Sequence, residues 1–266
     1  MKFLCLCAIY NHRQELTESL LQMWLDQTHK DSVLVFIDDR PPEMSLERHG
    51  GIVGGLENVH IFYNSRYPNL MAKYTAGIEF AAAKGIEWDA VCVMDDDDVY
   101  LPRYLECHAE FLKVTDFSYP DRVFSTYGHA LRTEDSGGRF WASAAYRRDL
   151  FEAIGGFGNS ARADFDQDML HRARAVAIPV DRNAICDAQD GPGVAMPQYV
   201  YQWELSDSHH CSSMMKGITD TTWYGVAAVA RSTGPLTPKY DESATWVHAA
   251  VAALPLSRSI YPELAT

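Results

Sequence analysis

The sequence predicts an α/β fold with a mainly parallel sheet flanked by helices, of the Rossmann-like kind. Two observations lead to this prediction: short apolar runs alternate with segments of helical periodicity, and turn residues separate the two kinds of segment. In such sheets, ligands bind beyond the carboxyl ends of the strands. We therefore expect the residues that directly follow the apolar runs to form the functional site.

The first half of the chain shows the clearest alternation. Four apolar runs have the length of buried strands: residues 2–10, 32–37, 59–63 and 90–94. Apolar residues at helical spacing predict helices over residues 13–27 and 70–84, and Gly85 is a suitable C-terminal cap for the second. A glycine-rich loop, residues 50–55, precedes the third strand.

The second half is less regular but continues the same pattern. Residues 123–130 and 139–146 are predicted strands, and residues 148–154 and 166–176 are predicted helices. The pair Gly155-Gly156 closes the first of these helices. Beyond about residue 215 the alternation is lost, which predicts one domain over residues 1–215 and a C-terminal extension over residues 216–266.

Composition narrows the class of protein. Of the 266 residues, 36 are acidic and 23 basic, which gives a formal charge of −13. No cluster of Lys and Arg is present for broad binding to phosphate backbones, and 47% hydrophobic content excludes a disordered or collagen-like chain. The N-terminal apolar run is too short to span a bilayer, so we expect a soluble, cytoplasmic protein without a membrane span.

Six cysteines are scattered through the chain without a CxxC pair: Cys5, Cys7, Cys92, Cys107, Cys186 and Cys211. Most lie inside apolar stretches, where free cysteine behaves as a small hydrophobic residue. We expect buried, reduced thiols.

Four consecutive aspartates, Asp95 to Asp98, follow the apolar run at 90–94. Carboxylates this close repel one another unless a cation compensates, and their hard oxygen ligands suit Mg²⁺ or Mn²⁺, which bridge to phosphate oxygens. This pattern predicts a divalent metal site for a nucleotide diphosphate. The alternative is a solvated acidic turn that caps a helix beginning near Pro102, but the position directly behind a buried strand favours the metal site.

Polar residues follow two further predicted strands, as Tyr10-Asn11 and as Asp38-Asp39. Because the carboxyl ends of parallel strands share one edge of a sheet, we expect these residues and the four aspartates to meet in one crevice.

The ordered set of motifs resembles a glycosyltransferase of the GT-A fold, most similar to family 2, over about residues 2–215. The motifs are Tyr10-Asn11-His12 after the first strand, Ile37-Asp38-Asp39 after the second, the helix start at residues 72–78, and Met94 to Pro102. The last motif matches the family's hydrophobic residue, Asp-x-Asp-Asp and later proline.

The resemblance implies a set of donor-binding residues: Tyr10, Asp38, Asp39, Lys73, Asp95 and Asp96. Tyr10 and Asp38 match the positions that hold uracil in relatives that use UDP-sugars, and Lys73 matches a basic position near the diphosphate. Asp97 and Asp95 match the two acids of the DxD motif and are assigned to the metal site, Asp97 as the direct ligand and Asp95 at a metal-bound water or at the ribose. Thr75 stands where the family usually has Asn.

A second group of residues resembles the acceptor side of the family. Gly155-Gly156-Phe157 matches a family turn, and the acidic segment from Asp164 onward matches the helix start that supplies the general base. Asp166 occupies the family's Asp, whereas Phe165 replaces the preceding Glu, so Asp164 or Asp168 are alternatives. Plain N-capping is the other interpretation of these acids.

His210, in a His-x-Ser context, matches a further metal or diphosphate contact, although a lone histidine often serves local hydrogen bonds instead. Trp141 is either a stacking surface for a sugar or part of the core.

Together these features predict a transferase that uses Mn²⁺ or Mg²⁺ and moves a sugar from a nucleotide-sugar donor, preferably UDP-linked, to a hydroxyl acceptor. Inversion at the sugar follows from the resemblance alone. The acceptor stays open among a glycan, a small molecule, a protein and a modified nucleic-acid base, as does the oligomeric state. Residues 216–266 are expected at the acceptor side or at an oligomer contact. The alternatives are a nucleotidyltransferase or phosphohydrolase, which also uses acidic clusters, and an inactive sugar-nucleotide binding module.

Overall fold

The computed structural model describes eleven segments of the chain: residues 1–9, 14–39, 55–64, 67–120, 122–125, 132–136, 140–158, 165–176, 188–189, 195–196 and 199–201. Most of the predicted loop at residues 50–55 and the whole extension at residues 216–266 lie outside these segments.

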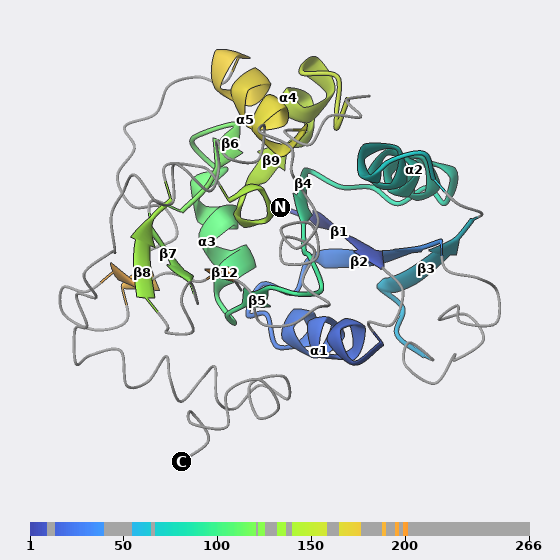
Figure 1. The fold of residues 1–266 in the computed structure, drawn as a ribbon, viewed down its shortest axis with the longest axis horizontal. Helices are drawn as coiled ribbons and strands as arrows, with labels where there is room; N and C mark the ends of the chain where they lie inside the picture. The colour runs from blue at the N-terminus through green and yellow to red at the C-terminus, as the bar shows by residue number, and fades with distance from the viewer. Residues whose placement is uncertain are drawn as a thin grey trace, which may run out of the picture.

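A six-stranded sheet in the order β3-β2-β1-β4-β9-β6 forms the centre of the molecule (Figure 1). Its strands are β1 Phe3–Ile9, β2 Ser32–Asp38, β3 Val59–Tyr63, β4 Ala90–Val93, β6 Phe117–Ser118 and β9 Ala145–Arg147. The first four neighbours pair in parallel, while β9 runs antiparallel to both β4 and β6. The predicted α/β fold with a mainly parallel sheet is therefore confirmed.

β1 and β2 are buried along their whole length, which explains why the sequence shows unbroken apolar runs rather than alternation. β1 lies between β2 and β4, with Ile9 opposite Asp38 and Leu6 opposite Val93. The carboxyl ends of all three strands consequently lie at the same edge of the sheet.

Two helices cover opposite faces of the parallel strands, α1 Gln14–Leu25 and α2 Leu70–Ala83 (Figure 1). The α2 helix begins where the side chain of Asn69 accepts a hydrogen bond of 2.8 Å from the backbone of Ala72. At Gly77, a Cβ atom would lie 2.5 Å from the Ile37 side chain, so glycine permits the close approach of α2 to β2. The helix ends before Gly85, which has a φ of +67°, as expected of the predicted cap.

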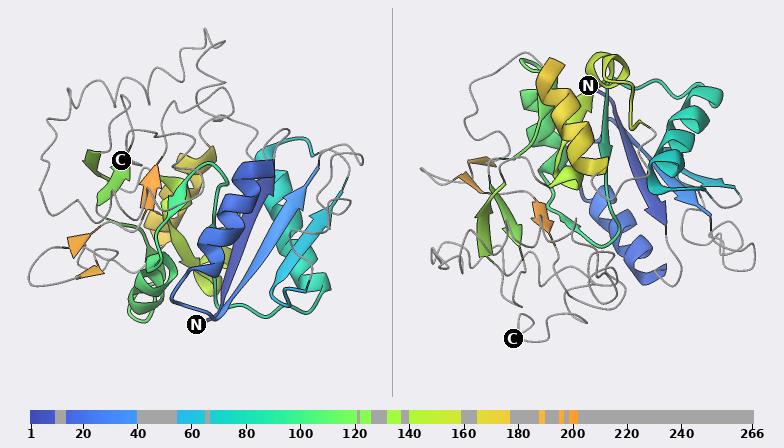
Figure 2. Two further views of the ribbon diagram at one scale, coloured as in Figure 1. Left: turned by 90° about the horizontal axis from the view of Figure 1, so that it is seen from below. Right: turned by 45° about the horizontal axis from the view of Figure 1, so that its top comes forward.

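The described residues include three further α-helices, α3 Tyr104–Phe111, α4 Arg148–Ala153 and α5 Phe165–Val176. The α4 and α5 helices lie next to each other beyond β9 (Figure 2). Both correspond to predicted helices, and α3 begins just after Pro102, as predicted.

The predicted strand at residues 139–146 is only partly a strand. Trp141–Ser143 form a 3-10 helix, and β9 begins at Ala145. Residues 140–145 are all buried, so the sequence shows no alternation that could separate the two conformations. The Ser143 hydroxyl donates 2.6 Å to the carbonyl of Phe140, a local bond that competes with strand pairing.

A second, four-stranded sheet in the order β5-β12-β7-β8 was not predicted as a unit. Its strands are β5 Val99–Tyr100, β7 Arg122–Ser125, β8 Arg132–Asp135 and β12 Tyr199–Tyr201, and a further short pair is β10 Ala188–Gln189 with β11 Ala195–Met196. The predicted strand at residues 123–130 appears as β7, and its remaining residues lie outside the described part.

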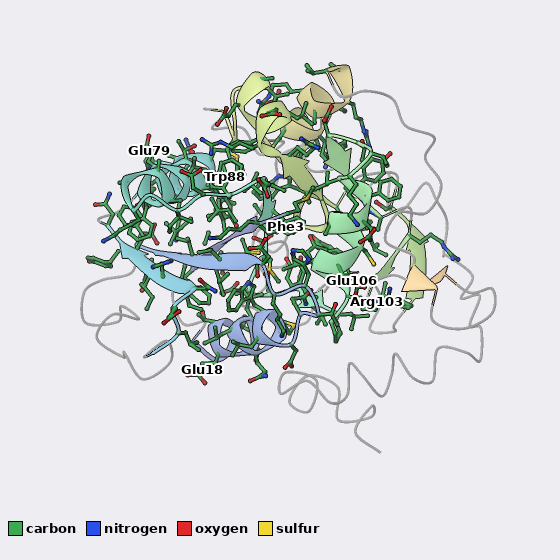
Figure 3. The ribbon with its side chains drawn as sticks, turned by 180° about the vertical axis from the view of Figure 1, so that it is seen from behind. Phe3, Glu18, Glu79, Trp88, Arg103 and Glu106 are labelled. Carbon is green, nitrogen blue, oxygen red and sulfur yellow. The ribbon has the colours of Figure 1, made fainter. Side chains whose placement is uncertain are left out.

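The core packs around β1, with Phe3 fully buried at its start, whereas Glu18 of α1 and Glu79 of α2 lie on the outer faces of their helices (Figure 3). The cysteines on described residues, Cys5, Cys7, Cys92 and Cys107, are buried and free, as predicted, while Cys186 and Cys211 lie outside the described residues. Among the described helices, none combines the length and apolar character that a bilayer crossing requires.

Candidate active site

Two neighbouring residues of α2 connect the carboxyl ends of three strands. The ammonium of Lys73 donates to the carbonyl of Ile9, at the end of β1, and to Oδ1 of Asp39, 2.7 Å away, just beyond β2. The hydroxyl of Tyr74 donates 2.7 Å to Oδ1 of Asp95, just beyond β4. The ends of β1, β2 and β4 are therefore linked through α2. Tyr10 and Asn11 lie outside the described residues, so the predicted common crevice stays a prediction.

The ion pair between Lys73 and Asp39 is largely removed from water. Lys73 is 2% exposed and Asp39 22% exposed. A buried ammonium is tolerated only when acceptors replace its lost hydration, and here a carbonyl and a carboxylate do so. The pair thus fixes the ends of β1 and β2 relative to each other. Asp38 is fully buried on β2, so Asp39 is the acid of this strand end that reaches the surface.

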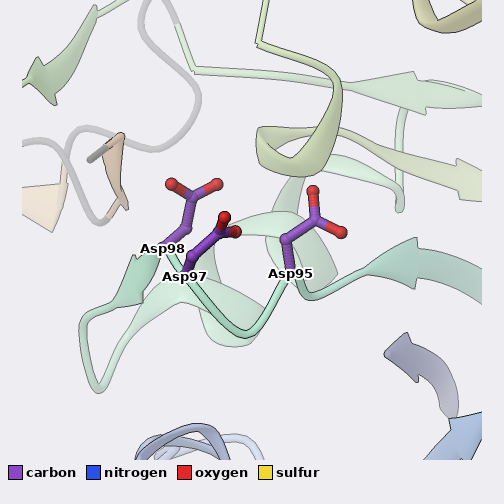
Figure 4. A group of neighbouring side chains, drawn as sticks. All are labelled: Asp95, Asp97 and Asp98. Carbon is purple, nitrogen blue, oxygen red and sulfur yellow. The ribbon is translucent and has the colours of Figure 1, made fainter. Parts of the chain in front are cut away.

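The acidic turn after β4 brings three carboxylates together. One oxygen each of Asp95, Asp97 and Asp98 lies within 4.8 Å of the others, and the three side chains project from the same side of the turn (Figure 4). Asp95 and Asp97 are partly exposed, whereas Asp98 is 1% exposed. Three oxygen ligands at this separation fit the coordination preferences of Mg²⁺ and Mn²⁺.

Asp96, the middle residue of the motif, differs from its neighbours because it is only 1% exposed. Burial raises the pKa of the Cys7 thiol well above its usual value, and the charge of Asp96 is the next largest cause. Asp96 therefore lies close to β1, inside the fold, and its carboxylate does not reach the surface in this conformation.

Three buried tyrosines hold the acidic turn. Tyr74 donates to Asp95, the backbone N–H of Asp95 donates 2.7 Å to the hydroxyl of Tyr100, and Tyr199 on β12 donates to Oδ2 of Asp98. Burial, with the charge of Asp98 next, raises the pKa of both Tyr100 and Tyr199 well above the usual value. Their hydroxyls therefore stay protonated.

The sequence places Asp98 in the acidic run of the predicted metal site but does not identify it as a ligand, and Tyr199 was not predicted as a site residue. Four adjacent aspartates give no sign of which carboxylates converge, because this depends on the path of the turn. Tyr199 belongs to the aromatic segment at residues 199–203. Because it lies 101 positions from Asp98 in the chain, no local sequence pattern indicates the contact between them.

The acidic turn does not cap the following helix. The N-cap of α3 is Arg103, which makes no side-chain capping bond. The chain behind the turn is held instead by the buried amide of Gln27, which donates 2.9 Å to the carbonyl of Leu101 and accepts 3.0 Å from the N–H of Leu105. The alternative of a solvated capping turn is therefore wrong.

The predicted Gly-Gly-Phe turn closes α4 and packs under α2. Gly155 and Gly156 have φ values of +77° and +62°, which favour glycine. The ring of Phe157 lies 5.4 Å from that of Tyr74 and 6.1 Å from that of Trp141. Trp141 is 6% exposed and its indole N–H donates to Met169 of α5, so it is part of the core rather than an open stacking surface.

Arg172 of α5 binds this turn. Its guanidinium donates to the carbonyls of Ile154, Gly156 and Phe157, the last two at 3.0 and 3.3 Å. It also donates 2.9 Å to Oδ2 of Asp168, which is 50% exposed. Of the predicted base residues, Asp168 thus lies in a surface ion pair.

Three predicted site residues, Tyr10, Asp164 and His210, lie outside the described residues, and Asp166 lies in the first turn of α5 with its side chain outside the described part. The residues that the structure brings together are Asp39 with Lys73, and Asp95 with Asp97 and Asp98.

Comparison with known proteins gives a consistent result. The model of Glycosyl transferase family 2 matches residues 6–156, more than half of the chain. No curated protein matches the sequence significantly.

Solved structures with the same fold include S. aureus TarS, at a TM-score of 0.58 and 16% identity over 98% of this chain and 44% of that chain. A structure of TarS residues 1–349 matches with a TM-score of 0.59 and 13% sequence identity. The match covers 99% of this chain and 82% of that chain. A third structure is the mannosyltransferase PcManGT from Pyrobaculum calidifontis in complex with GDP-Man and Mn²⁺. It matches with a TM-score of 0.50 and 14% sequence identity, over 99% of this chain and 84% of that chain.

This chain spans less than half of the longer TarS chain. At such low sequence identities the structural likeness shows the fold, which is GT-A. The match to the family model covers the ends of β1, β2 and β4 and the acidic turn. The chain belongs to glycosyl transferase family 2 and is a glycosyltransferase.

Proposed function

We propose that this glycosyltransferase depends on a divalent metal ion and transfers a sugar, with inversion, from a nucleoside-diphosphate donor to a hydroxyl acceptor. The observation that supports this proposal most strongly is the convergence of three carboxylate oxygens within 4.8 Å at the end of β4. The alternative of a nucleotidyltransferase or phosphohydrolase has no comparable support, because the match to the glycosyl transferase family covers this same turn.

Asp95, Asp97 and Asp98 are the residues that would hold the metal ion. Their carboxylates are hard, ionisable ligands, and the turn that bears them is fixed by Tyr100 and Gln27. When bound, a divalent ion supplies positive charge that stabilises the diphosphate as it leaves. PcManGT contains Mn²⁺, which makes Mn²⁺ the first ion to test and Mg²⁺ the second. His210 remains a proposed additional ligand from the sequence resemblance.

Donor binding is assigned to the ends of β1 and β2. We place the direct contact on Asp39, which is 22% exposed, and give Lys73 a holding role, since its ammonium is already bound to Ile9 and Asp39. The sequence resemblance places Tyr10 and Asp38 at a uracil, which favours a UDP-sugar. PcManGT binds GDP-Man, so guanine donors belong in the same test.

Asp166 is proposed as the general base. Its carboxylate would take the proton of the acceptor hydroxyl while that oxygen forms a bond to the anomeric carbon. The bond from the anomeric carbon to the β-phosphate oxygen breaks in the same step, and its electron pair leaves with the diphosphate. The position at the start of α5 favours the ionised carboxylate that this role requires.

A thermal-shift screen with UDP-, GDP-, dTDP- and CMP-sugars, with and without Mn²⁺, tests the donor assignment. A donor at about 100 times its Kd stabilises the folded state by about 2.7 kcal/mol. We expect stabilisation by one class of nucleotide and only in the presence of Mn²⁺. Equal stabilisation without the metal, or none by any donor, would contradict the proposal.

A further inference from the structure

We infer that Tyr199 is a positioning residue for the metal site, acting through Asp98. Its hydroxyl donates to Oδ2 of Asp98 from a strand that lies 101 positions later in the chain. The inference rests on the proposed function, because it concerns how the carboxylates of that site are held. It adds a residue outside the acidic motif to the machinery of the site.

The ring of Tyr199 is fixed on several sides, so its hydroxyl has a defined position. Tyr199 is 1% exposed and lies opposite Tyr100 in the antiparallel pairing of β12 with β5. Its ring centroid is 5.5 Å from that of Tyr100 and 6.4 Å from that of Tyr104. A hydroxyl held this way restricts the rotation of the carboxylate that accepts its hydrogen bond.

The same device holds Asp95, whose Oδ1 accepts from Tyr74 of α2. Two of the three converging carboxylates are therefore oriented by phenols that come from separate elements, one from α2 and one from β12. Small divalent ions demand nearly ideal ligand geometry, and partners that orient ligands typically change metal affinity by about 10- to 100-fold. Tyr199 accordingly contributes to metal affinity without itself being a ligand.

β12 also connects the acidic turn to the rest of the second sheet. Its residues pair with β5, which directly follows Asp98, and with β7 on the other side. Because coupling between binding and packing is reciprocal, a metal ion that gains from the Tyr199 hydroxyl also stabilises the docking of β12. Metal binding and the packing of the second sheet are thereby coupled.

The test compares Tyr199→Phe with Tyr104→Phe in the full chain. Both variants keep the ring and lose a buried hydroxyl hydrogen bond. The hydroxyl of Tyr104 donates 2.9 Å to the carbonyl of Ala142, whereas that of Tyr199 donates to Asp98 of the cluster. Binding of Mn²⁺ alone is measured from the EPR signal of free Mn²⁺, and thermal unfolding without metal verifies that both variants fold. We expect Tyr199→Phe to raise the Kd for Mn²⁺ about 10-fold. Tyr104→Phe, the control, should leave the Kd for Mn²⁺ within about twofold of the wild-type value.

A double-mutant cycle then tests whether the effect passes through Asp98. In an Asp98→Asn background, Tyr199→Phe should add no further loss of Mn²⁺ affinity. An unchanged Kd in Tyr199→Phe, an equal loss in Tyr104→Phe, or an additive loss in the cycle would overturn the inference while leaving the proposed metal dependence intact. A wild-type chain that binds no Mn²⁺ would overturn both.

Discussion

The two acidic regions of this chain, the turn after β4 and the start of α5, contain similar residues in very different surroundings. In the turn, Asp98 is buried and bonded to Tyr199, and Asp95 is bonded to Tyr74. On α5, Asp168 is half exposed and bonded to Arg172. Carboxylates held by neutral hydroxyls keep their full negative charge available for a cation, whereas a carboxylate paired with a guanidinium is already neutralised. The first region is thus suited to a metal ion, whereas in the second Asp168 is already paired with Arg172, and we propose Asp166 as the general base.

The largest expected effect separates the two acids of α5. Asp166→Asn should lower kcat by about 10²- to 10⁴-fold, because an amide cannot accept the acceptor's proton. Asp168→Asn should change kcat by less than about threefold, since an exposed ion pair contributes little. Both are measured as transfer rates at saturating donor. A larger loss in Asp168→Asn would move the base to that residue.

Lys73→Met tests whether the buried ion pair of Lys73 with Asp39 contributes more to stability than an ordinary surface pair. Removal of one partner of a buried pair costs about 3–5 kcal/mol, because the other charge remains without compensation. Lys113→Met is the matched control: Lys113 is 60% exposed and pairs with Glu110 at 2.6 Å, which predicts a loss below about 1 kcal/mol. Urea unfolding measures both. Equal losses would show that the Lys73 pair has no special structural role.

His108 offers a pH test of the buried layer next to the acidic turn. Burial lowers the pKa of His108 from its usual 6.5 to about 3, with its ring 4.6 Å from that of Tyr104. Below pH 6.5 the unfolded chain gains a proton that folded His108 does not take up, so stability falls as pH decreases towards 3. The contribution is about 1.4 kcal/mol per pH unit.

Urea unfolding between pH 7 and pH 5 measures this slope. His108→Gln should flatten it, whereas His171→Gln, at an exposed position of α5, should follow the wild-type curve. If His108→Gln and the wild type lose stability in parallel, the burial of a neutral His108 is refuted.

The smallest effect concerns stability at α5. Asp168→Asn should lower the free energy of unfolding by about 0.5 kcal/mol or less, since Arg172 retains its bonds to the carbonyls of Gly156 and Phe157. Arg172→Lys, which cannot reproduce that forked geometry, should cost more, about 2 kcal/mol. Urea unfolding of the two variants compares them directly, and the reverse order would assign the main contact to the ion pair.

Local patterns in the sequence were sufficient for the main sheet and for the position of the acidic turn. Apolar runs located β1, β2, β3 and β4, and the acids that follow β2 and β4 indicated the edge of the sheet at which the candidate site lies. The 3-10 helix at Trp141–Ser143 could not be predicted because every residue around it is buried.

The contacts that organise the candidate site could not be predicted from the sequence, because they join residues far apart in the chain. The expected position of Lys73 near a diphosphate stays a prediction, while its bonds to Asp39 and to the end of β1 were not predicted. Tyr199 contacts Asp98 only because β12 inserts between β5 and β7. Residue type and spacing identify which groups can do chemistry, and the tertiary fold decides which of them face one another.

The most direct test of the central claim is donor turnover as a function of the metal and of Asp97. Release of nucleotide diphosphate is followed for the wild type with Mn²⁺, after chelation, and after Mn²⁺ is restored, with Asp97→Ala measured alongside. We predict loss on chelation, recovery with Mn²⁺, and a decrease of at least about a hundredfold in Asp97→Ala, because the leaving diphosphate loses its counter-charge. Full turnover in chelator, or by Asp97→Ala, would contradict the account.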